Sequence, residues 1–390
     1  MTRRLETAFA IGALLLLPGS EVVWEGLIFS VYAVTLGVLV HHWRSVRVLL
    51  GAAWPLLLPV LLAACSIIWS VDPALTAYRV LALTGTTAFG FFLAIRFSLE
   101  DQLRLLVVML GIVGCASAVV ALVPPHYGVM TEPYYEGAWS GIFYHRNPFG
   151  RIMALASVVF LLHAMGRRPP RPVAALGAAL SVVLLLLSSS RTSVIAATGC
   201  LIAGGALTAL QSLAGRRRVA FVMTGAALAV VTSIWVVQHR VDILESMQRD
   251  LTLTGRSTLW AMLLDVARRH PWLGYGYGAF WRGDTGVSGE IQHALQGWYP
   301  VHAHNGLLDV ALELGIVGVA IVAFPLGMYA LRTCRWAIER PSSVRLWPAV
   351  YLCFFVLSNL TESALVRQNT LYWALYVAVV LTVHASEPAS

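Results

Sequence analysis

The sequence contains no lysine, so arginine supplies all 27 of its basic residues. Charged residues of both signs make up only 12% of the 390 positions, whereas soluble proteins carry about 25%. Hydrophobic residues make up 58%. This shortage of charge excludes a soluble globular protein and indicates a membrane protein.

Cysteine is also scarce; the five are Cys65, Cys115, Cys200, Cys334 and Cys353. No pair has the C-x-x-C spacing of a metal site, and none lies in a connection that we place on the outer side of the membrane. The sequence therefore contains no disulfide framework. We interpret the five cysteines as core packing residues of the helices.

Motifs for several kinds of chemistry are missing as well. No Asp-x-Asp, Asp-x-Glu or His-Glu-x-x-His sequence is present, so no catalytic metal is predicted. There is no Gly-x-Ser-x-Gly nucleophile elbow. The sequence predicts neither a metal nor an organic cofactor.

Long apolar runs recur from one end of the chain to the other. A helix needs about 17–25 apolar residues to cross the roughly 30 Å of membrane hydrocarbon, and the runs have this length. We predict an all-α polytopic membrane protein with about twelve transmembrane helices and no β-barrel pattern. The predicted spans are 6–19, 22–40, 50–69, 76–96, 104–123, 148–165, 173–190, 192–213, 219–237, 306–331, 345–361 and 369–385.

The arginines indicate how the spans are oriented. Sixteen of them lie on every second connection, which the positive-inside rule assigns to the cytoplasm together with both termini. The net charge of +8 is then mainly a topology signal. We divide the chain into helices 1–9 over 1–237, a large periplasmic loop with amphipathic helices over 238–303, and helices 10–12 over 304–390.

Two of the outward connections before the large loop carry candidate binding residues. The connection 124–147 is rich in tyrosine and tryptophan, which fits either an interfacial aromatic belt or a platform for sugar rings. At its end, His145, Arg146, Asn147 and Arg151 lie where the next helix begins, a position that suits an anionic group. In the tight turn SSSRTS, Arg191 is costly at the membrane boundary unless it meets an anion or reaches the headgroups.

The large loop and the segments after it hold the other candidates. TLTGRSTLW places Arg256 at the start of a helix predicted over 257–269, and the Gly-rich turn LGYGYGAFW follows. A second helix is predicted to begin near His304 and Asn305, with Gly315 and Gly318 permitting close contact or a kink. The last outward loop, SNLTESALVRQN, carries Glu362 and Arg367.

These residue types suit the displacement of a diphosphate. Guanidinium groups hold phosphate oxygens in pairs and keep their charge when desolvated. His304 is a candidate general base that takes a proton from an acceptor hydroxyl. Arg191 and Arg256 would hold the leaving diphosphate, and the remaining candidate substrate-binding residues are His145, Arg146, Asn147, Asn305, Glu362 and Arg367.

Four motifs in this order resemble a known family: SSSRTS, DLTLTGRSTLW, HPWLGYGYGAF and HAHNGLLDVALELGIVGV. Together with FYHRNPFGR, they are similar to the O-antigen ligase and polymerase superfamily (the Wzy/WaaL-like proteins), and within it to exopolysaccharide polymerases of the ExoQ type. The match covers roughly residues 140–365.

The resemblance implies a GT-C-like, metal-independent, inverting glycosyltransferase of the bacterial inner membrane with its active site facing the periplasm. Its donor would be an undecaprenyl-diphosphate-linked oligosaccharide, and its acceptor a glycan or lipid-linked acceptor. The family's diphosphate-binding arginines correspond to Arg191 and Arg256, and its catalytic histidine to His304; His302 has no secure counterpart. Polysaccharide export or chain-length proteins are implied partners, and membrane lipids surround the chain.

Three functions remain open on the sequence. The first is a polymerase of O-antigen or exopolysaccharide repeat units, which the TLTGR-x-x-x-W form favours. The second is an O-antigen ligase that transfers the glycan to lipid A-core or another acceptor. The third is a flippase or transporter without chemistry, for which we would expect ionisable residues near the midplane of broken helices.

Overall fold

The computed structural model describes residues 2–19, 25–123, 125–133, 135–166, 171–225, 256–295, 299–339 and 342–386. The described residues are helical and form no strand beyond an isolated bridge between Val129 and Trp139. The amphipathic helix predicted over 239–252 and most of the predicted span 219–237 lie outside these residues.

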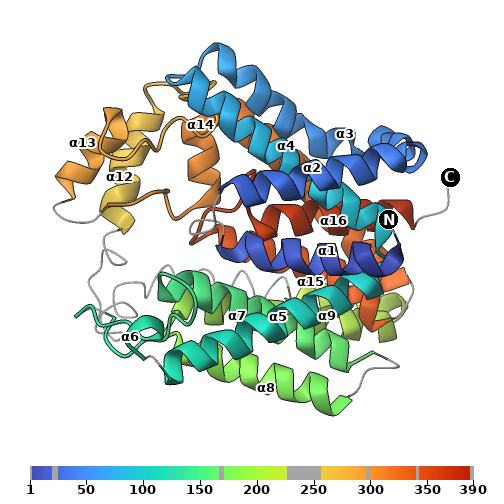
Figure 1. The fold of residues 1–390 in the computed structure, drawn as a ribbon. Helices are drawn as coiled ribbons and strands as arrows, with labels where there is room; N and C mark the ends of the chain where they lie inside the picture. The colour runs from blue at the N-terminus through green and yellow to red at the C-terminus, as the bar shows by residue number, and fades with distance from the viewer. Residues whose placement is uncertain are drawn as a thin grey trace.

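The order of the elements follows the predicted spans closely (Figure 1). The helices are α1 (Arg3–Leu16), η1 (Leu17–Gly19), α2 (Glu25–His41), α3 (Trp43–Cys65), η2 (Ser66–Ile68), α4 (Pro73–Arg96), α5 (Leu99–Leu122), α6 (Pro125–Gly128), α7 (Arg146–Ala164), α8 (Arg171–Leu187), α9 (Arg191–Ser212), α12 (Arg256–Ala267), α13 (Gly286–Ala294), α14 (Gly306–Glu339), α15 (Ser343–Asn359) and α16 (Leu371–Ala385).

Several of these helices can cross a membrane. Five are long and apolar enough by themselves, namely α4, α5, α7, α9 and α14. A bent pair within α2 and α3, with an angle of 92° between its halves, makes a sixth candidate among the described residues. The prediction of an all-α, multi-pass membrane protein is confirmed, while the count of twelve spans stays a prediction.

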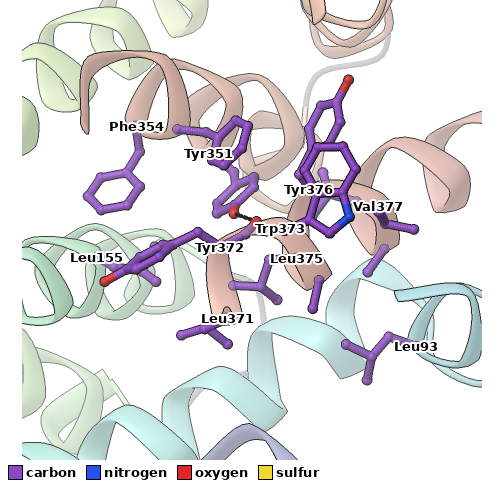
Figure 2. Close-up of a cluster of buried hydrophobic side chains, with 14 of the residues drawn as sticks. Leu93, Leu155, Tyr351, Phe354, Leu371, Tyr372, Trp373, Leu375, Tyr376 and Val377 are labelled. Carbon is purple, nitrogen blue, oxygen red and sulfur yellow. Dashed lines mark hydrogen bonds between the residues drawn. The ribbon is translucent and has the colours of Figure 1, made fainter. Parts of the chain in front are cut away.

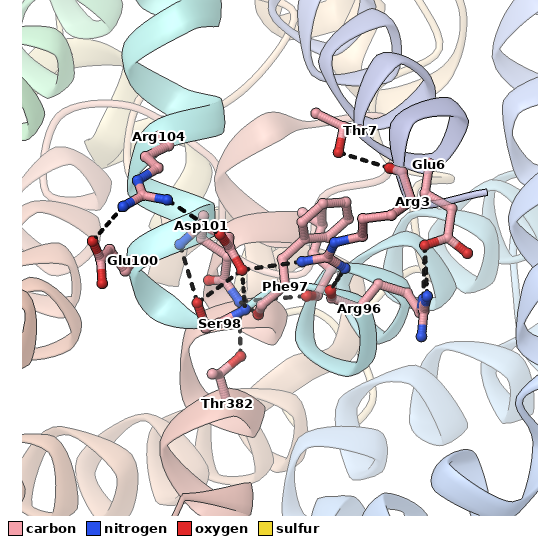
Figure 3. A network of polar contacts seen from close by, with 12 residues as sticks. Arg3, Glu6, Thr7, Arg96, Phe97, Ser98, Glu100, Asp101, Arg104 and Thr382 are labelled. Atoms are coloured by element: carbon pink, nitrogen blue, oxygen red, sulfur yellow. Dashed lines mark hydrogen bonds and ion pairs between the residues drawn. The ribbon is translucent and has the colours of Figure 1, made fainter.

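Ion pairs and hydrogen bonds join the N-terminal helix to α4 and α5 (Figure 3). The Glu6 carboxylate is 1% exposed and accepts two hydrogen bonds from Arg96, at 2.9 and 2.7 Å. Arg3 donates to the Arg96 carbonyl and, at 3.0 Å, to Asp101. Since Asp101 also completes the capping box of α5 with Ser98, these contacts fix where α1 meets the loop between α4 and α5.

The centre of the bundle is packed by aromatic side chains of α15 and α16 (Figure 2). The ring centroids of Phe355 and Tyr376 are 5.2 Å apart, with the rings nearly parallel. The Tyr351 hydroxyl donates to the Tyr372 carbonyl, which satisfies a polar group that would otherwise be buried without a partner. The residues of α16 are buried on all sides from Leu371 to Val383.

Two of the five cysteines contradict our interpretation of them as core residues. All five are free thiols, but Cys65 and Cys115 are exposed on the surface of the helices, whereas Cys200 is buried. A membrane helix keeps apolar residues on its lipid-facing side, so the hydrophobicity of a position does not predict burial within the protein.

α14 is broken at Gly315, as the two glycines in its sequence suggested. Gly315 has φ 64° and ψ −166°, a backbone conformation that favours glycine. A Cβ atom at this position would lie 2.2 Å from the Trp272 carbonyl group. The close approach of the Gly-rich turn therefore requires both the break and the absence of a side chain.

The Gly-rich turn replaces the hydrogen bonds that the break removes from α14. The Tyr275 and Gly276 amides donate to the carbonyls of Leu312 and Glu313, at 2.8 and 2.9 Å. On the other side of the break, the Ile316 amide donates to Pro271 at 2.8 Å. Backbone groups at a helix end near a membrane need such partners, so the turn and the beginning of α14 form one unit.

The break leaves a membrane-crossing length of helix on one side. Of the 34 residues of α14, 24 follow Gly315, which is about 36 Å of helix and enough to cross about 30 Å of hydrocarbon. The residues before the break lie with α12 and α13, at the end of the bundle opposite the N-terminus (Figure 1).

Candidate active site

The turn before α14 is held in a fixed conformation by its own polar groups. The Asn305 side-chain oxygen accepts from the amides of Leu307 and Leu308, both at 3.1 Å, and so caps the helix. The His304 amide donates to His302 Nδ1 at 3.1 Å. His304 itself has φ 51°, an unusual conformation for a residue other than glycine and one that is common at functional sites.

Four side chains from three parts of the chain meet at this turn, and we call them the histidine cluster: Arg256, His302, His304 and Glu362. The Glu362 carboxylate lies 3.5 Å from His304 Nδ1 and 3.6 Å from His302 Nε2. Arg256 begins α12, and its NH2 is 3.4 Å from Glu362 and 3.5 Å from His304 Nδ1. The structure thus brings together three of the predicted site residues, Arg256, His304 and Glu362.

The cluster keeps Glu362 ionised. Burial alone raises the pKa of this carboxyl, but the hydrogen bond to His304 and the electrostatic interactions with His302, His304 and Arg151 outweigh it and hold the pKa well below its ordinary value. For His302, burial followed by the neighbouring His304 lowers the pKa well below 6.5. His302 is therefore a neutral ring in the folded protein at neutral pH.

The tautomer of His302 follows from its contacts. Nδ1 accepts a hydrogen from the His304 backbone, so the single proton of the neutral ring lies on Nε2 and points to Glu362. His302 therefore places an N–H beside the carboxylate, at a distance longer than a direct hydrogen bond. We did not predict this role, because the sequence places His302 only two residues from His304.

The contact with Glu362 also favours one tautomer of His304. In the hydrogen bond with Glu362, Nδ1 donates to the carboxylate, and the lone pair of the neutral ring is then on Nε2. Arg256 NH2 also lies 3.5 Å from Nδ1, but a guanidinium only donates, so in this tautomer that approach is a contact and not a hydrogen bond. An imidazole oriented in this way by a carboxylate can take a proton from a hydroxyl, and the carboxylate then stabilises the imidazolium that forms.

The histidine cluster has the residue types of a metal site but not its chemistry. Ligand atoms of His302, His304 and Glu362 all lie within 4.8 Å of one another. Binding through His302 Nε2 would require the ring proton to move to Nδ1, which accepts from the His304 amide, and the Arg256 guanidinium already lies against the same carboxylate. A second cation beside a guanidinium is electrostatically unfavourable. These residues fit a carboxylate-supported base better than a metal centre.

The start of α7 supplies a further contact to the cluster. Asn147 donates to Glu362 at 3.5 Å, and its oxygen accepts from Ser190 at the same distance. His145 caps the helix, because its Nδ1 accepts from the Asn147 amide at 3.2 Å. Burial, followed by the neighbouring Arg146, lowers the pKa of His145. Asn147 therefore reaches the site directly, whereas His145 holds Asn147 in place.

Arg146, predicted at the end of the connection 124–147, and Arg191, predicted in the turn SSSRTS, both lie at the α8–α9 turn but make different contacts. Arg146 donates to the Ser189 carbonyl at 2.6 Å and stacks on the Tyr135 ring at 4.4 Å. Arg191 is the exposed first residue of α9. Among the described residues, no hydrogen bond or ion pair joins the Arg191 side chain to the cluster, although the adjacent Ser190 contacts Asn147.

Arg151 lies one turn after Asn147 on α7 and faces the same region. Its guanidinium stacks on Tyr372 at 4.3 Å and interacts electrostatically with Glu362. The Nε and NH1 atoms of Arg151 are buried without a hydrogen bond to a described residue. A buried guanidinium with such atoms is a position where an anion or water would be stabilised.

A cavity of about 420 Å³ adjoins the cluster. α4, the Gly-rich turn, α13, the beginning of α14 and the segment 363–368 line it, with Arg367 among the lining residues. The charged residues Arg79, Asp309 and Glu313 also line it, and none of them was a predicted site residue. Asp309 and Glu313 could have been indicated by their spacing of one helical turn, just after His304 and Asn305. The sequence around Arg79 gives no such signal.

The fold and the site define an all-helical, multi-pass membrane protein with a cluster of arginine, histidine and glutamate side chains at the turn before α14. Residues 176–323 match the family described as O-Antigen ligase. This segment includes Arg191, Arg256, His302 and His304, but not Asn147 or Glu362.

A relative of known name matches a larger part of the chain. The exopolysaccharide production protein ExoQ of Rhizobium meliloti (strain 1021) is 29% identical over 227 residues, which are 54% of this chain and 50% of the relative. The match thus spans about half the length of that protein. The predicted resemblance to the O-antigen ligase and polymerase superfamily, including its ExoQ-type members, is confirmed. The superfamily's chemistry is glycosyl transfer in polysaccharide synthesis.

Proposed function

We propose that the protein is an inverting, metal-independent glycosyltransferase that moves an undecaprenyl-diphosphate-linked glycan onto an acceptor sugar hydroxyl. It polymerises O-antigen or exopolysaccharide repeat units at the periplasmic face of the bacterial inner membrane, with both termini in the cytoplasm. The observation that carries the proposal is the contact of His304 with Glu362 at 3.5 Å, beside Arg256 at the start of α12.

The reaction requires one displacement at the anomeric carbon of the donor. His304 Nε2 takes the proton of the acceptor hydroxyl as the new bond forms between its oxygen and the anomeric carbon. The bond from that carbon to the diphosphate oxygen breaks, and its electron pair leaves with undecaprenyl diphosphate. A sugar hydroxyl is a very weak acid, so a general base contributes about 10²–10⁴-fold.

Arginine side chains stabilise the leaving diphosphate in this proposal. The contacts of Arg256 with Glu362 and His304 use one terminal nitrogen, NH2, and a guanidinium carries five N–H donors. Arg256 can therefore hold the carboxylate and a phosphate oxygen together, and Arg191 adds a second positive charge. We expect Arg191→Lys and Arg256→Lys to lose most activity, because lysine keeps the charge but not the planar fork.

Turnover by the purified protein tests the proposal. In nanodiscs with a lipid-linked oligosaccharide, it should release undecaprenyl diphosphate and form longer glycans, and EDTA should not slow the reaction. Transport of the donor without release of undecaprenyl diphosphate would contradict the proposal. Inhibition by EDTA that Mg²⁺ or Mn²⁺ reverses would contradict its metal-independent form.

The O-antigen ligase remains the second candidate, because the family that residues 176–323 match carries that description. Deletion of the gene separates the two candidates. Loss of a polymerase leaves single repeat units on the final carrier, whereas loss of a ligase leaves long chains on undecaprenyl diphosphate. Polysaccharide export and chain-length proteins are the expected partners in either pathway.

A further inference from the structure

Two chain segments contribute residues both to the histidine cluster and to the wall of the neighbouring cavity. Val301, at the exposed rim, lies next to His302, and Ser363 in the wall follows Glu362. The carboxylate of Asp309 accepts from the Ala303 amide at 3.0 and 3.1 Å and from Trp281 at 2.7 Å. The wall of the cavity therefore also positions the turn that carries the two histidines.

Two arginines and two acids line the cavity and are only partly paired. Arg79 and Arg367 carry positive charge, while burial raises the pKa of the Asp309 carboxyl and raises that of Glu313 to about 7. Glu313 interacts electrostatically with both arginines, yet within the described ranges no ion pair of 4.0 Å or less joins it to either. Charged groups around a hollow are costly unless a polar ligand or water satisfies them.

The mixture of donors and acceptors indicates the kind of ligand. The Tyr277 hydroxyl lies 2.8 Å from the Val366 carbonyl and 2.7 Å from the Gln368 side-chain oxygen and has one hydrogen to donate, so the Gln368 amide keeps both a donor and an acceptor for a ligand. Gln292 uses its nitrogen for the Pro300 carbonyl at 2.9 Å, so its oxygen can accept. Hydroxyl groups donate and accept at once, and they match such a lining.

Charged ligands fit this cavity less well than a neutral one. A phosphate would face the carboxyl oxygens of Asp309 and Glu313, where it needs donors, and a cation would face the guanidinium groups of Arg79 and Arg367. The volume of about 420 Å³ lies within the range of about 300–1,000 Å³ for small-molecule pockets. The Trp281 ring supplies apolar surface. A sugar ring combines the required size, hydroxyl groups and apolar face.

We propose that this cavity is a glycan subsite, which binds a sugar ring of the acceptor next to the ring that reacts. The proposal rests on the proposed function and deepens it. Val301 is three residues from His304, at most about 10 Å along the chain. An oligosaccharide that leaves the cavity at Val301 can therefore present its next hydroxyl to His304. The donor diphosphate stays on the side of Arg256, away from the carboxylates of the cavity.

Binding experiments with two probes test the subsite. The first probe is the repeat-unit oligosaccharide cleaved from the host's own polysaccharide, without lipid or diphosphate, and the second is undecaprenyl diphosphate. Both are titrated against purified protein in nanodiscs. Glu313→Gln removes a charged acceptor, and Val301→Trp blocks the rim from an exposed position without changing the charges. Tyr299→Trp is the control, since Tyr299 is exposed and does not line the cavity.

We expect Glu313→Gln and Val301→Trp each to weaken oligosaccharide binding by roughly tenfold or more, with undecaprenyl diphosphate binding unchanged. Arg256→Lys should weaken only the second probe, and Tyr299→Trp neither. The subsite is contradicted if the wild type does not bind the oligosaccharide, or if Val301→Trp binds it normally. Oligosaccharide binding without any turnover of lipid-linked donor would instead contradict the proposed function and support the subsite as a glycan site.

Discussion

At the scale of single residues, the central feature is one carboxylate in contact with both histidines and an arginine. Glu362 was a candidate substrate-binding residue on the sequence, but its distances to His304 and Arg256 make it a positioning residue in our proposal. It holds the His304 tautomer and compensates the charge that the ring gains. This role needs the negative charge as well as the shape of the side chain.

The substitution Glu362→Gln tests the role of this charge. We expect kcat to fall by about 10²–10⁴-fold, the contribution of a general base, because a neutral amide stabilises the imidazolium poorly. The KM for the lipid-linked donor should change little, and Glu362→Asp should restore part of the rate. A variant that raises KM and keeps kcat would place Glu362 in substrate binding instead.

The buried ring of His302 makes the stability of the fold depend on pH. Its folded pKa lies below the unfolded value of about 6.5, so the unfolded chain takes up the proton first. The stabilisation is fully present above about pH 6.5 and is lost as the pH falls toward the folded pKa. Glu362, whose pKa is also lowered, acts in the same direction below about pH 4.3.

We expect His302 to lower the melting temperature as the pH falls from about 7 to about 5. His145, whose pKa is also lowered, acts in the same direction, and Glu313, whose pKa is raised to about 7, acts against it. In His302→Gln, the same measurement should give a shallower fall, because glutamine does not titrate. Equal slopes for the two proteins would show that His302 is not buried as a neutral ring.

At the scale of elements, the unit formed by the Gly-rich turn and α14 positions the site. Gly315→Ala would place a methyl group 2.2 Å from the Trp272 carbonyl group, at a residue with φ 64°. We expect a loss of about 2 kcal/mol or more of folding free energy and a lower melting temperature. Gly327→Ala is a control within the same helix, because nothing lies within 4 Å of its Cβ position.

A helix-interior glycine such as Gly327 should tolerate alanine or gain up to about 1 kcal/mol from it. If Gly315→Ala melts like Gly327→Ala, the break in α14 does not depend on the conformational freedom of Gly315. Activity measured alongside should fall only in Gly315→Ala, since the turn before α14 carries His304.

The elements were predictable from sequence to different degrees. Apolar runs gave the positions of the long helices, because a membrane segment must satisfy its backbone internally and has a minimum length. The start of α14 was predicted near His304 and Asn305, and the end of α12 was predicted at residue 269, just before His270 and Pro271. The docking of the Gly-rich turn on Leu312 and Glu313 was not predicted, since it depends on contacts between segments about forty residues apart.

The same limit applies to the site. Arg256, His304 and Glu362 could each be named from residue type and position, but their convergence, and the part of His302 in it, depend on how three distant segments pack. The placement of Arg191 relative to the cluster stays a prediction, because no described contact joins them. No known motif includes Arg79, Asp309 or Glu313. They come together around one cavity only in the folded chain.

At the scale of the whole molecule, α12, α13 and the start of α14 lie at the end of the bundle opposite the N-terminus (Figure 1). α14 is a broken helix, a feature that we expected of a transporter. Its acids Asp309 and Glu313 precede the break, however, and the 24 residues after Gly315 are long enough to cross the membrane alone. The ionisable residues therefore lie at the edge of the span, which favours chemistry at the membrane surface over a transport path.

The most direct test of the central claim compares the wild type with His304→Ala in nanodiscs. Single-turnover release of undecaprenyl diphosphate is measured beside the binding of the lipid-linked donor. We predict that His304→Ala slows release by about 10²–10⁴-fold and binds the donor like the wild type. Release at the wild-type rate by His304→Ala would contradict the assignment of His304 as the base.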